Sequence, residues 1–179
     1  AAGETDFTGA ELVVCTWGGS TGAATKELVK GFEEKYGCTV ILDEVNQNSD
    51  RIAKIQSQIE SGNVETDVVY LSGAYAKQGE SLGLFEKIDT NVVTSLSDLY
   101  DFAQNDTGYG PMVCVGRFGI MYNEDVLNEK GLEPPTSYMD LFDDKYAGLV
   151  ALPAMTATAG PYVFSAIAED LGGDLTNYQ

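Results

Sequence analysis

The chain has 179 residues, enough for one domain or two small lobes, and its 28 acidic and 10 basic residues give a formal net charge of −18. This charge argues against nucleic acid as a partner, because a phosphate backbone is bound by a basic surface, and anionic membranes would also repel the protein. The sequence contains no histidine, which removes the commonest general base and the commonest transition-metal ligand. We expect no metal site and no cofactor.

The start of the chain is small and polar and shows no signal peptide. Residues 1–10 therefore predict a flexible tether, which would suit the mature end of an exported chain. A cytosolic chain that never had an export signal is the alternative. No run in the sequence is long and apolar enough to span a bilayer.

The sequence has three cysteines, Cys15, Cys38 and Cys114, and none of them forms a C-x-x-C pair. Neither a zinc site nor a redox pair is indicated by this spacing. Because all three lie in or at the start of apolar runs, we expect buried free thiols.

Apolar runs alternate with helical patterns in the first part of the chain. Residues 12–16, 39–42 and 67–71 predict buried strands, and the segments after them predict helices that end at Gly37, near Gly62 and near Leu82. The apolar stripes of the first two helices are Ala24, Leu28, Phe32 and Tyr36, and Ile52, Ile55 and Ile59. This alternation predicts an α/β fold with a doubly wound, mostly parallel sheet.

The second part of the chain begins with a long apolar run, "PMVCVGRFGIMYN", at residues 111–123. The internal Gly116 and Gly119 are typical of a strand that bends, as a strand passing between two lobes would. Short helices are expected at 124–130 and 138–142, the latter capped by Thr136 or Ser137, and a strand at 149–152. A loop of small residues, 156–161, leads into a last helix that ends near Leu171.

The turn "GGSTG", Gly18 to Gly22, matches the G-x-S-x-G pattern that presents a nucleophilic serine in hydrolases. A nucleophile at Ser20 needs a general base, usually histidine, and the sequence has none. The turn also matches neither the G-x-G-x-x-G pattern of dinucleotide-binding turns nor the Gly-Lys-Ser/Thr ending of a nucleotide-binding P-loop. We therefore interpret Ser20 or Thr21 as a helix cap that contacts a ligand. The small residues of the turn would let a solute approach the backbone.

Ligands in open α/β sheets bind beyond the carboxyl ends of the strands. Three loops leave those ends, and a fourth loop enters the last helix with free N–H groups and hydroxyls. The candidate ligand-binding residues in these loops are Trp17, Gly19, Ser20, Thr21, Asn46, Ser72, Tyr75, Thr156 and Thr158. Core packing is the alternative for Trp17, and ordinary capping is the alternative for the two threonines.

Several segments together carry a family resemblance: "LVVCTWGG", "LVKGFEEKYGCTVIL", "ETDVVYLSG", "GLFEKID", "GIMYNEDVL", "PTSYMDLFDDKYAGLVALP" and "LGGD". In this order and spacing, the chain resembles the first half of an extracellular solute-binding protein of an ABC importer. The similarity is to the spermidine/putrescine-binding branch and its relatives, which include ferric-ion and phosphonate binders.

The resemblance implies a non-enzymatic protein that captures a small solute between two lobes and delivers it to ABC permease subunits. It implies residues 11–115 as lobe 1, lacking its C-terminal return, and residues 116–179 as the hinge strand and first part of lobe 2. It also implies export to the periplasm, or to the cell surface as a lipoprotein. Because both lobes would be incomplete, we expect association with another chain.

The resemblance leaves the solute open. Trp17 sits where the polyamine branch has an aromatic residue, but Asn46 lies near a position where that branch has an acid. The acids that clamp amines before the second-lobe helix are absent. Arg117, with the loop before the last helix, would suit a carboxylate or phosphonate. Rival classes are a serine hydrolase and a cytosolic regulatory ligand-binding domain.

Overall fold

The computed structural model describes residues 7–104 and 107–173. The chain separates into two compact units, residues 1–113 (unit 1) and residues 114–179 (unit 2).

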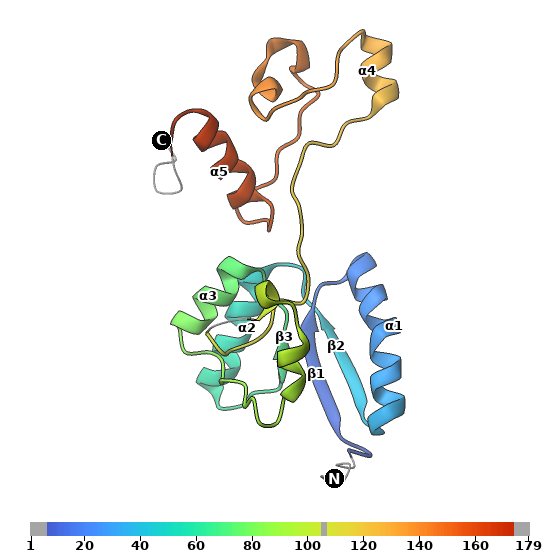
Figure 1. Ribbon diagram of the computed structural model, residues 1–179, viewed down its shortest axis with the longest axis vertical. Coiled ribbons are helices and arrows are strands. Elements are labelled where there is room, and N and C mark those ends of the chain that lie inside the picture. Colours follow the sequence, from blue (N-terminus) through green and yellow to red (C-terminus); the bar gives the residue numbers. More distant parts are fainter. Residues whose placement is uncertain (1–6, 105–106, 174–179) are drawn as a thin grey trace. The chain divides into compact units, whose positions relative to one another are not determined.

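Unit 1 is built on a parallel sheet with the strand order β2-β1-β3 (Figure 1). The strands are β1 (Glu11–Thr16), β2 (Thr39–Glu44) and β3 (Val68–Val69). β1 is paired with β2 along its whole length and with β3 at Val14 and Cys15. The predicted parallel α/β fold is confirmed, although β3 is shorter than the expected run of residues 67–71.

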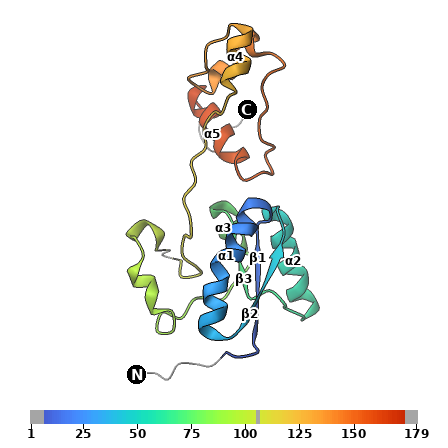
Figure 2. The same ribbon diagram turned by 90° about the vertical axis from the view of Figure 1, so that its right-hand side faces the viewer.

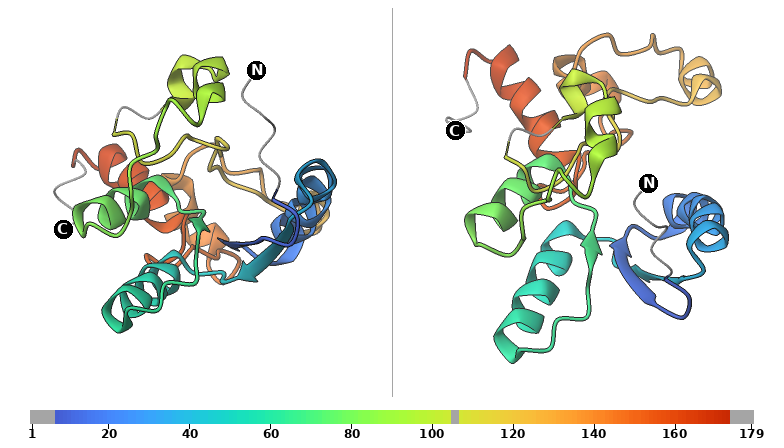
Figure 3. Two further views of the ribbon diagram at one scale, coloured as in Figure 1. Left: turned by 90° about the horizontal axis from the view of Figure 1, so that it is seen from below. Right: turned by 60° about the horizontal axis from the view of Figure 1, so that its bottom comes forward.

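Three helices connect and follow these strands: α1 (Gly19–Tyr36), α2 (Asn48–Ser61) and α3 (Gly73–Ser81). The chain moves from β1 to β2 in one direction and from β2 to β3 in the other, so right-handed crossovers place α1 and α2 on opposite faces of the sheet. Figures 2 and 3 show these two helices on opposite sides of the strands, and α3 packs against α2.

The core of unit 1 lies between the sheet and α2. The buried apolar residues there are Val14, Cys15, Ile52 and Ile55. The stripe expected for α1 is wrong as a core face, because Leu28 is 78% exposed and Phe32 is also exposed. Ile59 is exposed as well, and Gln58 takes the buried position beside it, where its side chain accepts a hydrogen bond from the Thr66 N–H.

The N-cap of α1 differs from the expected Ser20 or Thr21. Gly18 is the N-cap of α1 and Gln47 that of α2, and neither makes a side-chain cap hydrogen bond. The expected caps Ser20 and Thr21 already lie inside the first turn of α1. At the other ends, Gly37 and Gly62 adopt left-handed conformations that close the helices as the sequence predicted.

The rest of unit 1 contains two short 3₁₀ helices, Thr94–Asp98 and Asp101–Ala103. Backbone hydrogen bonds from Ile88 N–H to the Gly108 carbonyl and from Met112 N–H to the Ala103 carbonyl hold this segment together. An open pocket of about 490 Å³ lies within it, lined by residues between 88 and 111.

Unit 2 contains α4 (Glu124–Lys130), two 3₁₀ helices (Met139–Phe142 and Asp144–Tyr146) and α5 (Gly160–Asp170). Its buried apolar residues are Leu127, Tyr146, Val163 and Ile167. An apolar pocket of about 370 Å³ lies over three of these residues.

The hinge strand expected from residue 116 and the strand expected at 149–152 are both wrong, since none of the described residues of unit 2 is assigned to a strand. Both segments have the apolar composition of strands. A strand also needs a hydrogen-bonded neighbour, however, and none of the described residues supplies one. Their apolar side chains are exposed instead, most of all Met121, which is 96% exposed.

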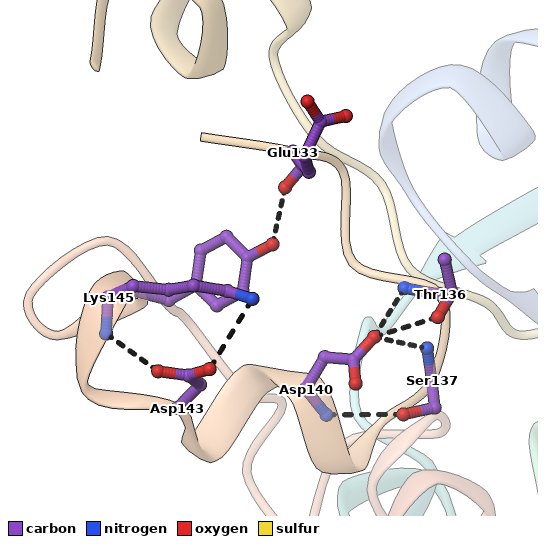
Figure 4. Close-up of polar contacts among 7 residues, drawn as sticks. Glu133, Thr136, Ser137, Asp140, Asp143 and Lys145 are labelled. Carbon is purple, nitrogen blue, oxygen red and sulfur yellow. Dashed lines mark hydrogen bonds and ion pairs between the residues drawn. The ribbon is translucent and has the colours of Figure 1, made fainter. Parts of the chain in front are cut away.

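Side-chain caps organise the polar turn before the first 3₁₀ helix of unit 2 (Figure 4). The Asp140 carboxylate accepts hydrogen bonds from the Thr136 N–H and hydroxyl and from the Ser137 N–H, while Ser137 Oγ accepts from the Asp140 N–H. These bonds, those of Thr136 first, lower the pKa of Asp140 to about 2. Ser137 thus bonds to the start of this helix as a capping residue would, although the N-cap of the 3₁₀ helix is Tyr138, which corrects the expected cap at Thr136 or Ser137.

Candidate functional site

The carboxyl ends of β1, β2 and β3 lie at one edge of the sheet, because the three strands are parallel neighbours (Figure 1). Trp17 follows β1, Val45 and Asn46 follow β2, and Tyr70 follows β3 at this carboxyl edge. The backbone is closely joined there: Val45 N–H donates to the Thr16 carbonyl and Tyr70 N–H to the Cys15 carbonyl, both at 2.9 Å. The three loops therefore start from a fixed geometry.

Arg51, in the first turn of α2, is fully buried beneath these loops at 0% exposure. Its Nε donates to the Val45 carbonyl at 2.6 Å, its Nη2 to the Asn46 carbonyl at 3.2 Å, and its Nη1 to the Tyr70 carbonyl. Burial lowers the pKa of Arg51, whose ordinary value is so high that the guanidinium stays charged. One cation thus joins the loops after β2 and β3.

Trp17 is half-buried, and its ring lies against Arg51 and Tyr70. The Arg51 Cζ is 4.4 Å from the ring centroid, and the Trp17 and Tyr70 rings are stacked with centroids 5.9 Å apart. Trp17 is therefore partly packed, with Arg51 over its ring and the Tyr70 ring stacked on it, and a contact between Trp17 and a solute stays a prediction.

Two asparagine side chains tie neighbouring loops together. Asn46 Oδ1 accepts from the Gly18 N–H, and Asn48 Oδ1 accepts from the Ser72 N–H, both at 3.0 Å. Asn46 thereby joins the loop after β2 to the start of α1, and Asn48 joins α2 to the start of α3. Asn46 is exposed and lies at the surface of the carboxyl edge.

Glu44 lies beside two glycines of the "GGSTG" turn, Gly18 and Gly22. A Cβ on Gly18 would lie 2.9 Å from Glu44 Oε2, and one on Gly22 would lie 2.9 Å from both Glu44 Oε1 and the Trp17 carbonyl. The Glu44 carboxylate therefore occupies the space beside both glycines, where it also pairs with Lys26 at 2.8 Å. Gly19 has open space around it and is needed for its positive φ of 64°.

Ser20 and Thr21 are exposed in the first turn of α1. Neither caps the helix, so the expectation of a capping contact at Ser20 is wrong. Their position leaves both hydroxyls at the carboxyl edge, next to N–H groups of the helix start.

Behind Arg51, a second set of polar groups joins the sheet to α2. Lys54 pairs with Asp43 at 2.6 Å, and Asp43 also contacts Cys15. Burial, followed by the hydrogen bond with Asp43, raises the pKa of Cys15 to about 11, so this thiol is not a nucleophile at neutral pH. Of the three free cysteines only Cys15 is buried, which corrects the expectation for the half-buried Cys38 and the exposed Cys114.

The structure distributes the sequence-predicted residues over both units. Trp17, Gly19, Ser20, Thr21, Asn46, Ser72 and Tyr75 lie at or next to the carboxyl edge of unit 1, with Tyr75 half-buried on α3. Arg117, Thr156 and Thr158 lie in unit 2, where Arg117 and Thr156 are exposed. Gly160, at the start of α5, is buried against the Ala154 carbonyl, where no Cβ would fit.

Sequence reasoning missed Arg51, Glu44 and Tyr70. A signal for Arg51 was present, because Asn48, Arg51, Ile55 and Gln58 follow the helical spacing of one buried face. Glu44 carried no such signal, since its place beside the glycines depends on the register of β2.

Among the described residues, no group of three or more His, Cys, Asp or Glu side chains could hold a metal ion. The same residues contain no helix with the length and apolar character needed to cross a membrane.

The fold places the chain in the class of α/β proteins with a parallel sheet. The model of the family described as bacterial extracellular solute-binding protein matches residues 27–178, and the chain belongs to this family. No match was found among curated proteins.

Two solved structures are similar to the chain. One, at 26% identity and a TM-score of 0.58, is titled an ABC transporter from Clostridium perfringens, and the alignment covers 92% of this chain and 50% of that one. The other is the spermidine/putrescine ABC transporter substrate-binding protein PotD from Streptococcus pneumoniae in complex with calcium and HEPES. It is 18% identical with a TM-score of 0.59, and the alignment covers 95% of this chain and 50% of that one, so it supports the fold alone. The chain thus spans about half the length of these structures.

Proposed function

We propose that this chain is the solute-capturing part of an ABC importer's substrate-binding protein, and that the carboxyl edge of unit 1 contributes one side of the solute site. The observation that carries the proposal is the joining of three strand ends into one rigid edge by Arg51, Asn46 and Asn48. A preorganised edge of this kind binds a solute without first having to be ordered.

The residues proposed to contact the solute in unit 1 are the exposed or half-buried groups at this edge: Trp17, Gly19, Ser20, Thr21, Asn46, Ser72 and Tyr75. Arg117, Thr156 and Thr158 are the candidate solute contacts proposed within unit 2. In this proposal residues 11–115 belong to lobe 1 and residues 116–179 to lobe 2. The whole protein would act outside the cytoplasm, free or lipid-anchored, and would pass its solute to permease subunits without catalysing a reaction.

The solute proposed for this edge carries a carboxylate or phosphonate, and a polyamine is the rival. The Arg51 guanidinium lies 4.4 Å from the centroid of Trp17, so a solute cation at about 8 Å from it would be repelled by about 2 kcal/mol at an effective dielectric constant of about 20. The N-termini of α1, α2 and α3 lie at the same edge and also favour negative charge. Glu44 opposes this preference, but its carboxylate is paired with Lys26.

Trp17 is the single tryptophan of the sequence, so its fluorescence reports on this edge alone. We would titrate the protein with putrescine, spermidine, amino acids, 2-aminoethylphosphonate and ferric citrate, and follow both Trp17 emission and the unfolding temperature. A saturable change with 2-aminoethylphosphonate or an amino acid supports the proposal. A response to polyamines alone would overturn the preference for an anionic group, and a thermal shift without any change in Trp17 emission would place the site elsewhere.

A matched pair of asparagine variants locates the response. Asn46→Ala removes a side chain at the carboxyl edge, whereas Asn63→Ala removes one at the opposite edge, between α2 and β3, where it contacts Glu65. We expect Asn46→Ala to weaken binding of the responding probe by about tenfold, because the variant loses roughly one hydrogen bond and the loop order that this bond maintains. Asn63→Ala should leave binding unchanged, and equal effects of the two variants would contradict the assigned edge.

A further inference from the structure

We infer that Arg51 is a positioning residue of the solute site: it holds the Trp17 ring and the loops after β2 and β3 in the arrangement that receives the solute. This inference rests on the proposed function and adds a role for a side chain that cannot itself touch a solute, because it is 0% exposed. It also names the group on which the geometry of the carboxyl edge depends.

The contacts of Arg51 reach all three loops. Its guanidinium donates to the carbonyls of Val45, Asn46 and Tyr70, and its Cζ lies over the Trp17 ring, 4.4 Å from the centroid. A planar guanidinium has five N–H donors in a fixed fork, so one side chain can fix several carbonyls at set angles. A lysine has a single ammonium on a flexible stem and cannot reproduce this arrangement.

The contacts also extend outward to the surface. The Asn46 carbonyl accepts a hydrogen bond from Arg51, and its side-chain Oδ1 accepts one from the Gly18 N–H. The position of the start of α1 therefore depends on Arg51 through Asn46. The Tyr70 carbonyl likewise accepts a hydrogen bond from Arg51, while the Tyr70 ring stacks on Trp17. Loosening Arg51 would therefore loosen Trp17 from two sides.

The charge of Arg51 argues against a role in core packing alone. No ion pair with a carboxylate is formed by Arg51 within residues 7–104 and 107–173, and its charge is compensated by carbonyl oxygens and an aromatic face. Burying a cation in this way is costly, and an apolar side chain of similar volume packs a core at least as well. What an apolar side chain lacks is the set of directed bonds to the loops.

A measurement on the unmodified protein tests the contact first. The sequence has two arginines, Arg51 and Arg117, and Arg117 is exposed. In a nitrogen-edited NMR spectrum we expect one arginine Nε–H signal that exchanges slowly with water and is displaced by the Trp17 ring current. Trp17→Phe should reduce that displacement; two fast-exchanging arginine signals at random-coil positions would overturn the inference without any arginine variant.

The variants are Arg51→Met and Arg51→Lys, with Lys54→Met as the matched control. Lys54 is a cation on the same helix, but it contacts Asp43 in β2 and not the loops. All are measured without solute, by acrylamide quenching of Trp17 and by amide hydrogen exchange in residues 17–22, 45–48 and 70–73. In Arg51→Met we expect exchange in all three segments to rise by about tenfold, with more quenching of Trp17.

Arg51→Lys keeps the charge and should recover only part of the protection, whereas Lys54→Met should change neither readout. A folded Arg51→Met protein with unchanged exchange and quenching would overturn the inference, as would a full recovery by lysine. If Arg51→Met does not fold, the lysine variant and the NMR signal decide the question.

Solute binding is then measured separately, with the probe among putrescine, spermidine, amino acids, 2-aminoethylphosphonate and ferric citrate that binds the unmodified protein. Arg51→Met should weaken it by more than tenfold, and Lys54→Met by less than about twofold. If no probe binds the unmodified protein, the proposed function fails for that set of solutes, while exchange and quenching still decide the role of Arg51. Binding that survives loosened loops would overturn the positioning role.

Discussion

Unit 1 and unit 2 place similar apolar sequences in different environments. In unit 1 the apolar run at residues 11–16 becomes the central strand of a parallel sheet and is covered by α2. In unit 2 the runs at 116–123 and 149–152 are not strands in the structure, and many of their side chains are exposed. The difference teaches that an apolar run forms a strand only where the chain also supplies its hydrogen-bonded neighbours.

The two units also differ in how they order their polar groups. Unit 1 buries the charged Arg51 and the polar Asn48 among backbone groups of its loops, whereas unit 2 combines the buried Tyr146, whose hydroxyl donates to the Glu133 carbonyl, with exposed or half-buried caps such as the one at Asp140. We therefore expect the geometry of unit 1 to be set by buried directed bonds, and that of unit 2 to be more sensitive to solution conditions.

The largest expected effect concerns the exposed apolar side chains of unit 2. We expect the chain of 179 residues to associate at micromolar concentration, with a light-scattering mass above the 19.2 kDa of one copy. Met121→Lys should lower this association more than Leu28→Lys, because Met121 is 96% exposed in unit 2 and Leu28 is 78% exposed on α1 of unit 1. A mass of one copy at all concentrations would contradict the expectation.

A smaller effect is expected at the Glu44 contact in unit 1. Gly22→Ala forces a Cβ against the Trp17 carbonyl and the Glu44 carboxylate, and should lower the free energy of unfolding by about 1–3 kcal/mol. Gly31→Ala on the same helix is the control, since its Cβ meets open space and should stabilise α1 by up to about 1 kcal/mol. Denaturant unfolding followed by Trp17 emission measures both, and equal shifts would show that Glu44 does not occupy that space.

The smallest effect is local to unit 2 and depends on pH. The pKa of Asp140 is lowered to about 2, below the ordinary value of about 3.9. Its cap therefore stabilises the turn fully above the ordinary value, and this stabilisation is lost as the pH falls from about 4 to about 2. The amide signals of Thr136 and Ser137 should titrate near pH 2, and Asp140→Asn should abolish that titration while leaving the Trp17 signal unchanged. A midpoint near 3.9 would contradict the cap.

Much of unit 1 could be predicted from the sequence. The strands at 11–16 and 39–44 and the helices between them follow from apolar runs and glycine stops, and the parallel order places Trp17, Asn46 and Ser72 at one edge. That these residues bind a solute stays a prediction. Unit 2 was harder, because the propensity of residues 149–152 for a strand says nothing about whether a neighbour is present.

The side chains that organise the edge could not be predicted in full. A charged residue on a helix is usually solvated, so the sequence does not single out Arg51, although its spacing with Ile55 places it on the buried face. The small residues of the "GGSTG" turn suggest room for a solute, but the space beside Gly18 and Gly22 is occupied by Glu44. Pairings of this kind depend on strand register, which local sequence does not specify.

The most direct test of the central claim is a titration followed by NMR, with 2-aminoethylphosphonate, putrescine and spermidine as probes. The account predicts that the anionic probe moves the Trp17 indole signal and the amides of Gly19, Asn46 and Ser72, while the amide of Asn63 at the opposite edge stays in place. Changes confined to signals away from the carboxyl edge, or a response of these signals to the polyamines alone, would contradict it.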